Sequence, residues 1–425
     1  MLNTHITHQI YAKLSFEATF NQKKIIEQLS SWLSDDDFGR IFILNGYAGT
    51  GKTTIIAAVV DALKTLGIKT ILLAPTGRAA KRLTEVTGEE ASTIHRLLEY
   101  GGDEDTFARS EDYPLEADCI IVDEMSMVDA RLAYRLFSSI GESCRAVLLG
   151  DDEQLQSVGA GAVLRDLINS GVVPVAKLNK IHRQDSDCNI FINLHKVRDG
   201  RTDLSYGEDF FLTEEDYIEK IESIMVEMYL EKIKEYGIEN VMLLSPFKNH
   251  SAGVHSLNTI IQSRLNPAKN GSIEMFGPNS TVFRENDIVM QLKNRPDDQI
   301  VNGDIGKVKK ITMKDGEVTM IVEFASGKVT YSADDAQELA LAYSYTVHKS
   351  QGSEAKCVIT CIHNMHSIML KRNLFYTAFT RGKKEVRIVG QKSALVRAIN
   401  TEDKTKRYTA FKMLLKMKMG VFLNV

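Results

Sequence analysis

The chain has 425 residues, and its content of 44% hydrophobic and 25% charged residues is typical of a globular protein with about two to four domains. Its net charge of −4 excludes a general electrostatic attraction to nucleic acid, so any such contact needs a local basic groove. The sequence shows no signal-peptide pattern, no apolar stretch long enough for a membrane and no disulfide framework among its five cysteines, so we expect a cytoplasmic protein with no membrane partner.

The first clear element is an amphipathic helix predicted over residues 23–33, whose apolar side chains share one face. Gln22 lies just ahead of this helix, some thirty residues before a glycine-rich loop. A side-chain amide can read adenine through paired hydrogen bonds, although surface glutamines are common. Gln22 is therefore a candidate adenine-binding residue only in combination with that loop.

The pattern that organises the chain is Ile41–Ile56, IFILNGYAGTGKTTII. A short buried strand leads into a glycine-rich turn, and Lys52-Thr53-Thr54 opens an apolar helix, which is the setting of the G-x-x-x-x-G-K-[ST] phosphate loop. Glycines and a helix N-terminus let backbone N–H groups surround an anion. We predict that Lys52 reaches the β- and γ-phosphates of a nucleotide and that the Thr53 hydroxyl binds Mg²⁺. The nucleotide-binding positions are Gly46, Ala48, Gly49, Thr50, Gly51, Lys52, Thr53 and Thr54.

Two later strands are predicted at Cys119–Val122 and Ala146–Leu149, and polar residues follow each of them, where parallel sheets place their binding loops. After the first strand, Asp123 can hold Mg²⁺ through water and Glu124 can orient and deprotonate the attacking water. After the second, Gln154 lies where an amide can contact the γ-phosphate. The three side chains complete a predicted ATP-hydrolysing site with Lys52.

An acidic stretch without a core pattern, residues 99–118, separates these strands from another predicted at Lys69–Pro75. It has the length of a small hairpin or excursion. Phe107 is its lone large apolar residue away from the ends. We therefore expect an insertion there in an otherwise regular α/β domain.

In the second half, a strand is predicted at Val241–Ser245 after two helical stretches. Residues 271–337 then alternate with period two between turn signals, which predicts a small β-barrel-like insert, and the core sheet is expected to resume at Leu339–Val347. The spacing of two cysteines and two histidines further on superficially resembles a zinc site. It lies on CVITCI, a run typical of a buried strand, so we interpret these cysteines as apolar side chains (Cys357, Cys361, His363, His366).

The last stretch, residues 371–425, is basic, with fourteen Lys and Arg against three Asp and Glu. It could attract phosphates, but a run of charge is more often a solvated face. The composition does not decide between the two.

Seven blocks together resemble the superfamily 1B helicases, most closely the RecD-like and phage Dda-type DNA helicases. They are GYAGTGKTT, APTGRAAKRL, STIHRLL, VDEMSM, GDDEQLQSVGAG, LAYSYTVHKSQGSE (341–354) and LFYTAFTRGKKEVRIVG (374–390). The blocks occur in the family's order between residues 22 and 390 and cover nearly the whole chain. One departure is Gly382, which stands where the family's Y-T-A-x-T-R segment is usually followed by alanine.

The resemblance implies an α/β fold of two RecA-like phosphate-loop domains with parallel sheets. The first would span residues 1–178, with the small hairpin insert at about 99–118. The second would span 179–425, and the insert at about 271–337 would be the SH3-like domain that helps to hold DNA. The chain starts about twenty residues before Gln22, so we also expect it to lack the long N-terminal extension of some bacterial RecD-like relatives.

The resemblance also implies roles for residues that their local pattern does not explain. Arg183 and Arg381 would face the γ-phosphate from the second domain, and Gln351, Gly352 and Glu354 would belong to the nucleotide-linked segment, with Glu354 at the ribose. Phe107 would be the wedge that separates strands, or simply an anchor of its loop. The residues that would line the single-strand channel are Thr76, Arg78, Thr93, His95, Thr346, His348 and Lys349.

We therefore expect an ATP- and Mg²⁺-dependent 5′→3′ DNA helicase that moves on single-stranded DNA and acts at junctions with duplex. It would work as a monomer, with replication or recombination proteins as partners, and its direction rests on the resemblance alone. Two alternatives remain: an RNA helicase of the same superfamily, which a contact to the 2′-hydroxyl would distinguish, and a phosphate-loop switch ATPase whose activity ignores DNA.

Overall fold

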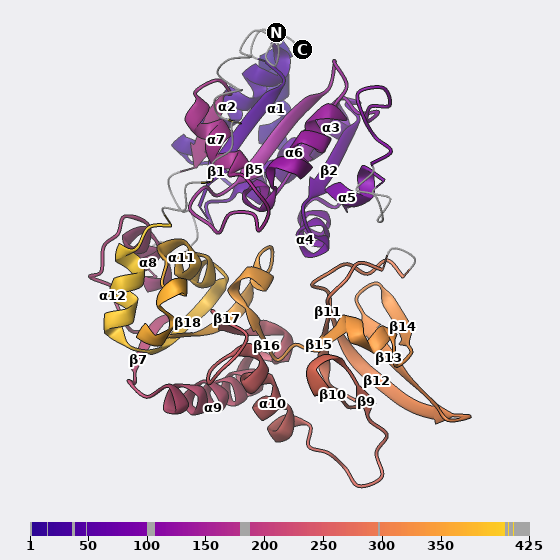
Figure 1. Ribbon diagram of the computed structural model, residues 1–425. Coiled ribbons are helices and arrows are strands. Elements are labelled where there is room, and N and C mark those ends of the chain that lie inside the picture. Colours follow the sequence, from indigo (N-terminus) through magenta and orange to yellow (C-terminus); the bar gives the residue numbers. More distant parts are fainter. Residues whose placement is uncertain are drawn as a thin grey trace. The chain divides into compact units, whose positions relative to one another are not determined.

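The structure is a computed structural model that describes residues 2–14, 16–35, 39–47, 49–99, 107–178, 188–295, 298–403, 407 and 411. The chain divides into two compact units (Figure 1). The first comprises Met1–Ser186 together with Lys404–Val425, and the second comprises Asp187–Asp403. Each unit is built around its own parallel sheet.

The first unit holds a six-stranded sheet in the order β3-β2-β4-β5-β1-β6, and all of its strand pairs are parallel. Its inner strands are mostly apolar because helices cover both faces, as parallel sheets require. The strands are β1 (Ile41–Gly46), β2 (Thr70–Ala74), β3 (Ala91–Thr93), β4 (Cys119–Val122), β5 (Arg145–Gly150) and β6 (Val175–Leu178).

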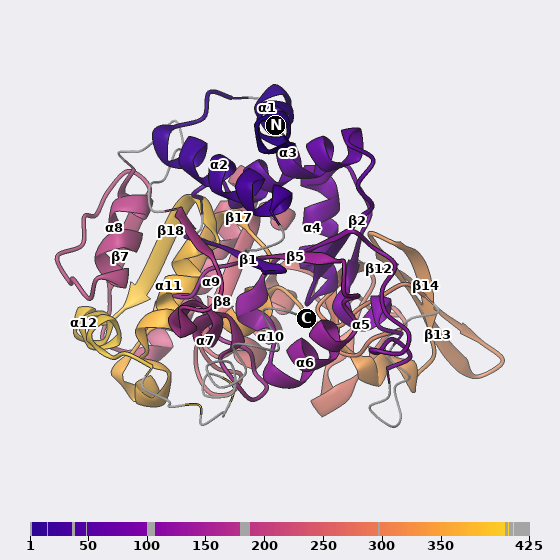
Figure 2. The ribbon, with the colours of Figure 1, turned by 90° about the horizontal axis from the view of Figure 1, so that it is seen from above.

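Helices cover both faces of this sheet (Figure 2). Two separate hydrophobic cores pack against it. One contains α1 (Leu2–Lys13), α2 (Phe20–Ser34) and α3 (Lys52–Thr65), with Trp32 and Leu29 fully buried. The other contains α5 (Ile94–Leu97), α6 (Ala130–Ser138) and α7 (Val163–Ser170) with the short helix η2 (Met125–Met127). Helix α4 (Gly77–Thr87) contacts α3, β2 and β3.

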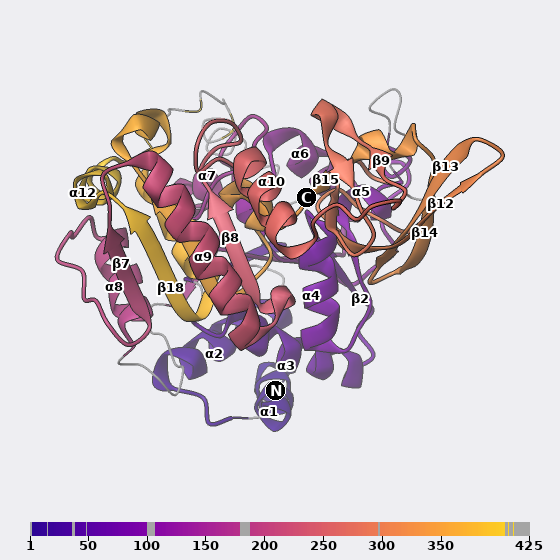
Figure 3. The ribbon, with the colours of Figure 1, turned by 90° about the horizontal axis from the view of Figure 1, so that it is seen from below.

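The second unit holds a five-stranded parallel sheet in the order β16-β8-β17-β18-β7. Helix α9 (Ile218–Tyr236) crosses β8, β17 and β18 on one face (Figure 3). The other elements are β7 (Phe210–Glu214), β8 (Val241–Ser245), β16 (Ser344–Thr346), β17 (Ala355–Ile362), β18 (Gly382–Gly390), α8 (Asn189–Arg198), α10 (Val254–Leu265), α11 (Arg372–Thr380), α12 (Lys392–Asn400), η3 (Ile238–Asn240), η6 (Val347–Ser350) and η7 (Asn364–Met369).

Between α10 and β16 the chain builds a five-stranded antiparallel sheet in the order β14-β13-β12-β11-β15. This is the insert that the period-two pattern predicts. Its strands are β11 (Ile288–Gln291), β12 (Ile305–Lys314), β13 (Glu317–Phe324), β14 (Gly327–Tyr331) and β15 (Leu339–Leu341), with the pair β9 (Met275–Phe276) and β10 (Val282–Phe283) and the short helices η4 (Pro278–Ser280) and η5 (Asp335–Glu338) beside it.

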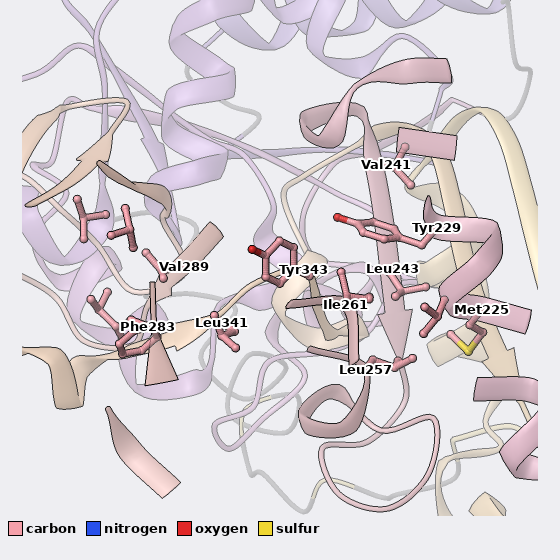
Figure 4. Close-up of a cluster of buried hydrophobic side chains, with 14 of the residues drawn as sticks. Met225, Tyr229, Val241, Leu243, Leu257, Ile261, Phe283, Val289, Leu341 and Tyr343 are labelled. Carbon is pink, nitrogen blue, oxygen red and sulfur yellow. The ribbon is translucent and has the colours of Figure 1, made fainter. Parts of the chain in front are cut away.

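The insert and the parallel sheet share one continuous hydrophobic core. In Figure 4, Tyr343 lies between the side chains of α9, β8 and α10 and those of the insert. Asp287, which is completely buried, accepts hydrogen bonds from Gln262 (2.5 Å), Asn266 (2.7 Å) and the Tyr343 hydroxyl (2.9 Å), and so joins the insert to α10. Shared packing and the fully hydrogen-bonded Asp287 carboxylate fix the insert to the rest of the second unit.

The chain divides into its compact units after Ser186, with Lys404–Val425 grouped with the first, and the domain bounds of 1–178 and 179–425 stay a prediction. One strand boundary differs from the expectation. The expectation that the core sheet resumes at Leu339–Val347 is wrong in part, because β15 pairs with β11 of the insert and the parallel sheet resumes only at β16. Among the residues that the structure describes, no helix combines the length and apolarity needed to cross a bilayer.

The stretch expected as a hairpin, 99–118, forms no hairpin strand in its described part, residues 107–118. Ser110 and Tyr113 exchange two backbone hydrogen bonds of 3.2 Å across a tight turn, and the Arg109 guanidinium lies 4.1 Å from the Tyr113 ring centroid. Residues 100–106 lie outside the described part. The backbone N–H groups of Ala108 and Arg109 donate to the carbonyls of Glu99 and Leu98, both at 3.4 Å, so the two described ends of the excursion lie together.

Candidate active site

The phosphate loop joins β1 to α3, as predicted. Gly49 and Gly51 have φ of +78° and +87°, in the left-handed region that favours glycine, and Gly51 is the N-cap of α3. At Gly46 a side chain would lie 2.8 Å from the Cβ of Leu178 and 2.9 Å from the Thr50 hydroxyl. The glycines of the motif therefore serve both backbone conformation and close packing.

Lys52 is the first residue of α3, and its ammonium group is turned toward the loop. It donates hydrogen bonds to the carbonyl oxygens of Gly46 and Tyr47, the second at 3.1 Å. Thr50 closes the turn by donating from its hydroxyl to the same Tyr47 carbonyl at 2.7 Å. A lysine at the start of a helix, beside a glycine-rich loop, is an arrangement that suits the phosphates of a nucleotide.

The acidic pair follows β4, as predicted. Asp123 accepts a hydrogen bond from the backbone N–H of Glu124 at 2.8 Å, and Glu124 has a left-handed φ of +53°, which is strained for a non-glycine residue. Burial, and then the Glu124 charge, raise the pKa of Asp123 to about 6, while the Lys52 and Arg82 charges oppose the rise. Asp123 follows β4 and Lys52 follows β1, so both lie at the carboxyl edge of the same sheet.

Gln154 lies in the turn after β5 and is 4% exposed. Its Nε2 donates to Asp151 at 3.4 Å, and its Oε1 is buried with no hydrogen-bond partner, so one polar atom is ready for a ligand. The turn is tied to β1, because Asn45 Nδ2 donates to Asp152 Oδ1 at 2.8 Å and Arg165 donates to the Asp152 carbonyl at 2.7 Å. Asn45 and Asp152 position this turn, and neither was predicted as a site residue.

Gln22 lies inside α2 rather than ahead of it. It is the third residue of the helix and forms a capping box with Thr19, accepting a hydrogen bond from the Thr19 backbone N–H at 3.0 Å. Its Nε2 atom would lie 3.3 Å from a side chain on Gly51. Helix capping fixes the Gln22 amide beside the phosphate loop, and the signal T-x-x-Q at 19–22 was readable in the sequence.

Three of the predicted DNA contacts are threonines that cap short helices after strands. Thr76, Thr93 and Thr346 begin α4, α5 and η6, and each hydroxyl oxygen accepts from a backbone N–H, those of Ala79 (3.3 Å), Arg96 (3.2 Å) and Lys349 (3.4 Å). A capping threonine still has its hydroxyl proton to donate. Each loop can therefore present a hydroxyl and helix N–H groups to a phosphate.

Phe107 packs against the first unit. Its ring centroid lies 6.2 Å from that of His95 and 5.7 Å from the Arg135 guanidinium carbon, and it borders the core on the α6 side. Burial lowers the pKa of His95 below its ordinary value, so the imidazole is neutral at physiological pH. This packing is what an anchor of the turn requires.

The predicted second-unit residues lie in and around η6 and α11. Burial, and then the Lys371 charge, lower the pKa of His348, and Lys349 donates to Asn302 of the insert. Gln351 is buried and Gly352 has φ of +74°. Glu354 forms an ion pair with Lys383, with 3.1 Å between Oε2 and Nζ.

Arg381 is 2% exposed and ends α11. Its guanidinium donates to the Ser353 carbonyl (3.3 Å), the Thr377 carbonyl (3.2 Å) and the Thr380 hydroxyl (3.1 Å). These bonds join the end of α11 to the segment that carries Glu354. Arg183 and Ala48, also predicted as site residues, lie outside the described residues, and Arg78 is half-buried in α4.

The cysteine–histidine spacing has other partners. Burial raises the pKa of both Cys357 and Cys361 to about 12, and Cys361 lies 3.9 Å from the Ala252 carbonyl oxygen. His363 Nε2 lies 2.9 Å from the Asp216 carbonyl oxygen. The described residues bring no three metal-binding side chains together.

Comparison with known proteins identifies the family. Family models match an AAA domain over residues 21–222, the SH3 domain of ATP-dependent RecD-like DNA helicases over 257–324, and a UvrD-like helicase C-terminal domain over 341–389. The RecBCD enzyme subunit RecD of Mycolicibacterium smegmatis is 31% identical over 406 residues, which cover 85% of this chain and 70% of that subunit. The chain belongs to the RecD family of helicases. The resemblance seen in the seven sequence blocks is thereby confirmed.

A second RecD-family relative is longer. The ATP-dependent RecD2 DNA helicase of Deinococcus radiodurans is 34% identical over 374 residues, which cover 88% of this chain but 50% of that protein. The chain thus spans half of that relative's length, and the activity, substrates and partners of the whole relative are a proposal for this chain.

Solved structures support the fold. The Pif1 helicase of Bacteroides in complex with ADP-AlF3 and single-stranded DNA matches with a TM-score of 0.55 at 19% identity, covering 95% of this chain and 98% of that one. The Pif1 helicase of Candida albicans gives the same TM-score at 18% identity, and the match covers 95% of this chain and 100% of that one. The α/β fold with two RecA-like lobes and an SH3-like insert is confirmed.

Proposed function

We propose that this RecD-family protein is an ATP- and Mg²⁺-dependent DNA helicase that moves 5′→3′ on single-stranded DNA and separates duplex. The observation that carries the proposal is that Lys52, Asp123 and Gln154 follow β1, β4 and β5 at the carboxyl edge of one parallel sheet. A phosphate-binding cation, an ionisable metal ligand and an amide that can donate to a phosphate oxygen are the parts that ATP hydrolysis needs.

The residues present fit a magnesium nucleotide. Thr53 and Asp123 would hold Mg²⁺, directly and through water, which suits an ion that keeps most of its ligands as water and phosphate oxygens. The bound ion would neutralise charge that develops on the phosphates. Glu124 would orient and deprotonate the attacking water, and Gln154 would contact the γ-phosphate.

In this proposal the second lobe supplies charge when the lobes close around ATP. Arg381, together with Arg183, would stabilise the transition state, a contribution worth about 10³–10⁵ in rate in other phosphoryl-transfer enzymes. Gln22 would read adenine and Glu354 the ribose. Alternating grip on the strand by Thr76, Thr93 and Thr346 would turn each cycle into a step.

The DNA partners would be single-stranded DNA and its junctions with duplex. The relatives' names support DNA as the substrate class, since they are a RecD2 DNA helicase and RecBCD subunits. The protein would act in the cytoplasm, as a monomer, beside proteins of replication or recombination. Phe107, which packs against its own unit, is proposed as a turn anchor rather than as a wedge.

The test is unwinding of one duplex that carries either a 5′ or a 3′ single-stranded tail, with ATP and Mg²⁺. Unwinding of the 5′-tailed substrate alone, absent in Lys52→Ala, would support the proposal. A 3′ preference would overturn the direction. No unwinding, together with ATP hydrolysis that DNA does not stimulate, would replace the helicase with a switch ATPase, and unwinding of only RNA-containing substrates would make it an RNA helicase.

A further inference from the structure

The basic C-terminal stretch contributes to the first unit. Asp403 belongs to the second compact unit, whereas the chain from Lys404 onward groups with the first. Two residues of this segment are described, Arg407 and Phe411, and both contact the first unit. Phe411 packs against the core formed by α5, α6 and α7, and Arg407 contacts the loop that follows Gln154.

Arg407 meets three oxygen atoms of one loop. Its Nη1 donates to the carbonyls of Gly159 at 2.6 Å and Gly161 at 2.8 Å, and to the hydroxyl of Ser157 at 3.1 Å. Ser157 is 4% exposed. A guanidinium stays charged at every physiological pH and gives up little freedom per hydrogen bond, so this is a strong and permanent clamp.

The opposite side of the same loop is held by α6. A side chain on Gly159 would lie 2.1 Å from a carboxylate oxygen of Asp129, and Gly161 has φ of +98° with Ala130 packed against it. The Ala130 backbone N–H donates to the Ala160 carbonyl at 2.8 Å. The loop is therefore fixed between α6 and Arg407, and only Arg407 comes from a distant part of the sequence.

This loop begins three residues after Gln154, whose Oε1 is buried and unpaired. We propose that Arg407 is a positioning residue for ATP hydrolysis, which holds the loop of Ser157, Gly159 and Gly161 so that the Gln154 amide stays at the γ-phosphate. The inference rests on the proposed function of Gln154. It gives the basic stretch a role that its composition alone did not show.

The expected kinetic effect is on turnover rather than on nucleotide binding. Lys52 and the phosphate-loop amides lie on other elements, so ATP affinity should survive loss of Arg407. A displaced Gln154 would lose its alignment with the γ-phosphate, and misplacement by about 1 Å costs up to about 10²-fold in rate. Arg407→Ala should therefore lower kcat by about fivefold or more and change KM for ATP by less than about twofold.

The experiment measures ATP hydrolysis by the full chain, with and without single-stranded DNA, for wild type, Arg407→Ala, Arg407→Lys and Gln154→Ala. Arg397→Ala is the matched control, since it removes an exposed cation of the same basic stretch. Arg407→Lys should restore part of kcat, because an ammonium can still donate to the loop oxygens. In the Gln154→Ala background, Arg407→Ala should change kcat by less than about twofold, since the two residues act through one contact.

Three results would overturn the inference: Arg407→Ala equal to Arg397→Ala, a loss that appears in KM instead of kcat, or losses that multiply in the Arg407/Gln154 double variant. Ser157→Ala removes one acceptor from the same clamp and should shift kcat in the same direction by a smaller factor. If Arg407→Ala fails to fold, the kcat of Ser157→Ala tests the clamp in its place. Wild-type hydrolysis that DNA does not stimulate would refute the proposed function, yet the basal kcat values would still test Arg407.

Discussion

The two units each contain a parallel strand, a loop and a helix in the same order, and only one of the two loops is built for phosphate. In the first unit β1 leads through Gly49 and Gly51 to Lys52 at the start of α3. In the second, β8 leads through residues 246–253 to Val254 at the start of α10. The topology is shared, so the chemical difference must lie in the loops.

Three backbone donors at the end of the loop after β8 already have acceptors within the second unit. The backbone N–H of Ala252 donates to the Glu222 carboxylate at 2.5 Å, and those of Gly253 and Val254 donate to carbonyl oxygens of the loop at 3.0 and 3.1 Å. Glu222 thus already supplies the anionic oxygen that a phosphate would bring. A strand–loop–helix unit becomes a nucleotide site only when glycines open the turn and no carboxylate fills it.

The largest expected effect is the loss of nucleotide binding and hydrolysis on substitution in the phosphate loop, compared with substitution in the loop after β8. Lys52→Ala should abolish ATP hydrolysis and unwinding, because no other described cation lies at the start of α3 to meet the phosphates. Lys248→Ala, which removes an exposed lysine from the loop after β8, should leave nucleotide binding unchanged. Binding of a fluorescent ATP analogue by both variants makes the comparison, and equal losses would contradict it.

The next effect tests what the second unit contributes in place of a phosphate loop. Arg381→Ala should reduce kcat by about 10²–10³ while ATP still binds, as expected when a donor to the transition state is lost. Arg381→Lys should recover little, since one ammonium cannot replace guanidinium bonds to Ser353 and Thr380. Single-turnover hydrolysis checks this, with Arg397→Ala as the control. A rise in KM with unchanged kcat would show that Arg381 serves only binding.

A smaller effect concerns pH in the first unit. Burial raises the pKa of Asp123 from 3.8 to about 6, so the fold favours the neutral carboxyl and ionisation costs stability as pH rises from about 4 to 6. Mg²⁺ needs the ionised form. The apparent affinity of the site for Mg²⁺ should therefore fall by up to about tenfold for each pH unit below 6. Mg²⁺ titrations of ATP hydrolysis between about pH 5 and 7.5 measure this, and Asp123→Asn should remove the dependence.

The smallest effect probes Glu222 of α9, whose carboxylate accepts from the loop after β8. Glu222→Ala leaves the buried Ala252 N–H without its acceptor and should lower the free energy of unfolding by about 1–3 kcal/mol. ATP hydrolysis should be unaffected, because this loop binds no nucleotide. Urea unfolding of the full chain, monitored by fluorescence, measures the free energy of unfolding. Unchanged stability would mean that Glu222 is not what satisfies this loop.

The sequence predicted the site best where function and local structure use the same residues. The phosphate loop, Asp123, Glu124 and Gln154 each follow a strand whose apolar run is readable, so their shared edge could be predicted. Leu339–Val347 reads as one strand, and only pairing with β11 and β8 divides it between two sheets. The contact of Arg407 with Gly159 and Gly161 has no local signal, because it joins positions some 250 apart in the chain.

The position of the insert has a consequence for how the second unit folds. β8 pairs with β16, yet Leu243 and its partner Ser344 stand on either side of the whole antiparallel sheet in the chain. A parallel pairing over such a separation is slow to form from an unfolded chain. Closing the long loop costs conformational entropy before any stabilising contact forms. The β12–β13 hairpin pairs residues close in the chain, so we expect it to form earlier. We therefore expect the insert to form early and to bring β16 close to β8, because Asp287 and Tyr343 join it to the rest of the second unit.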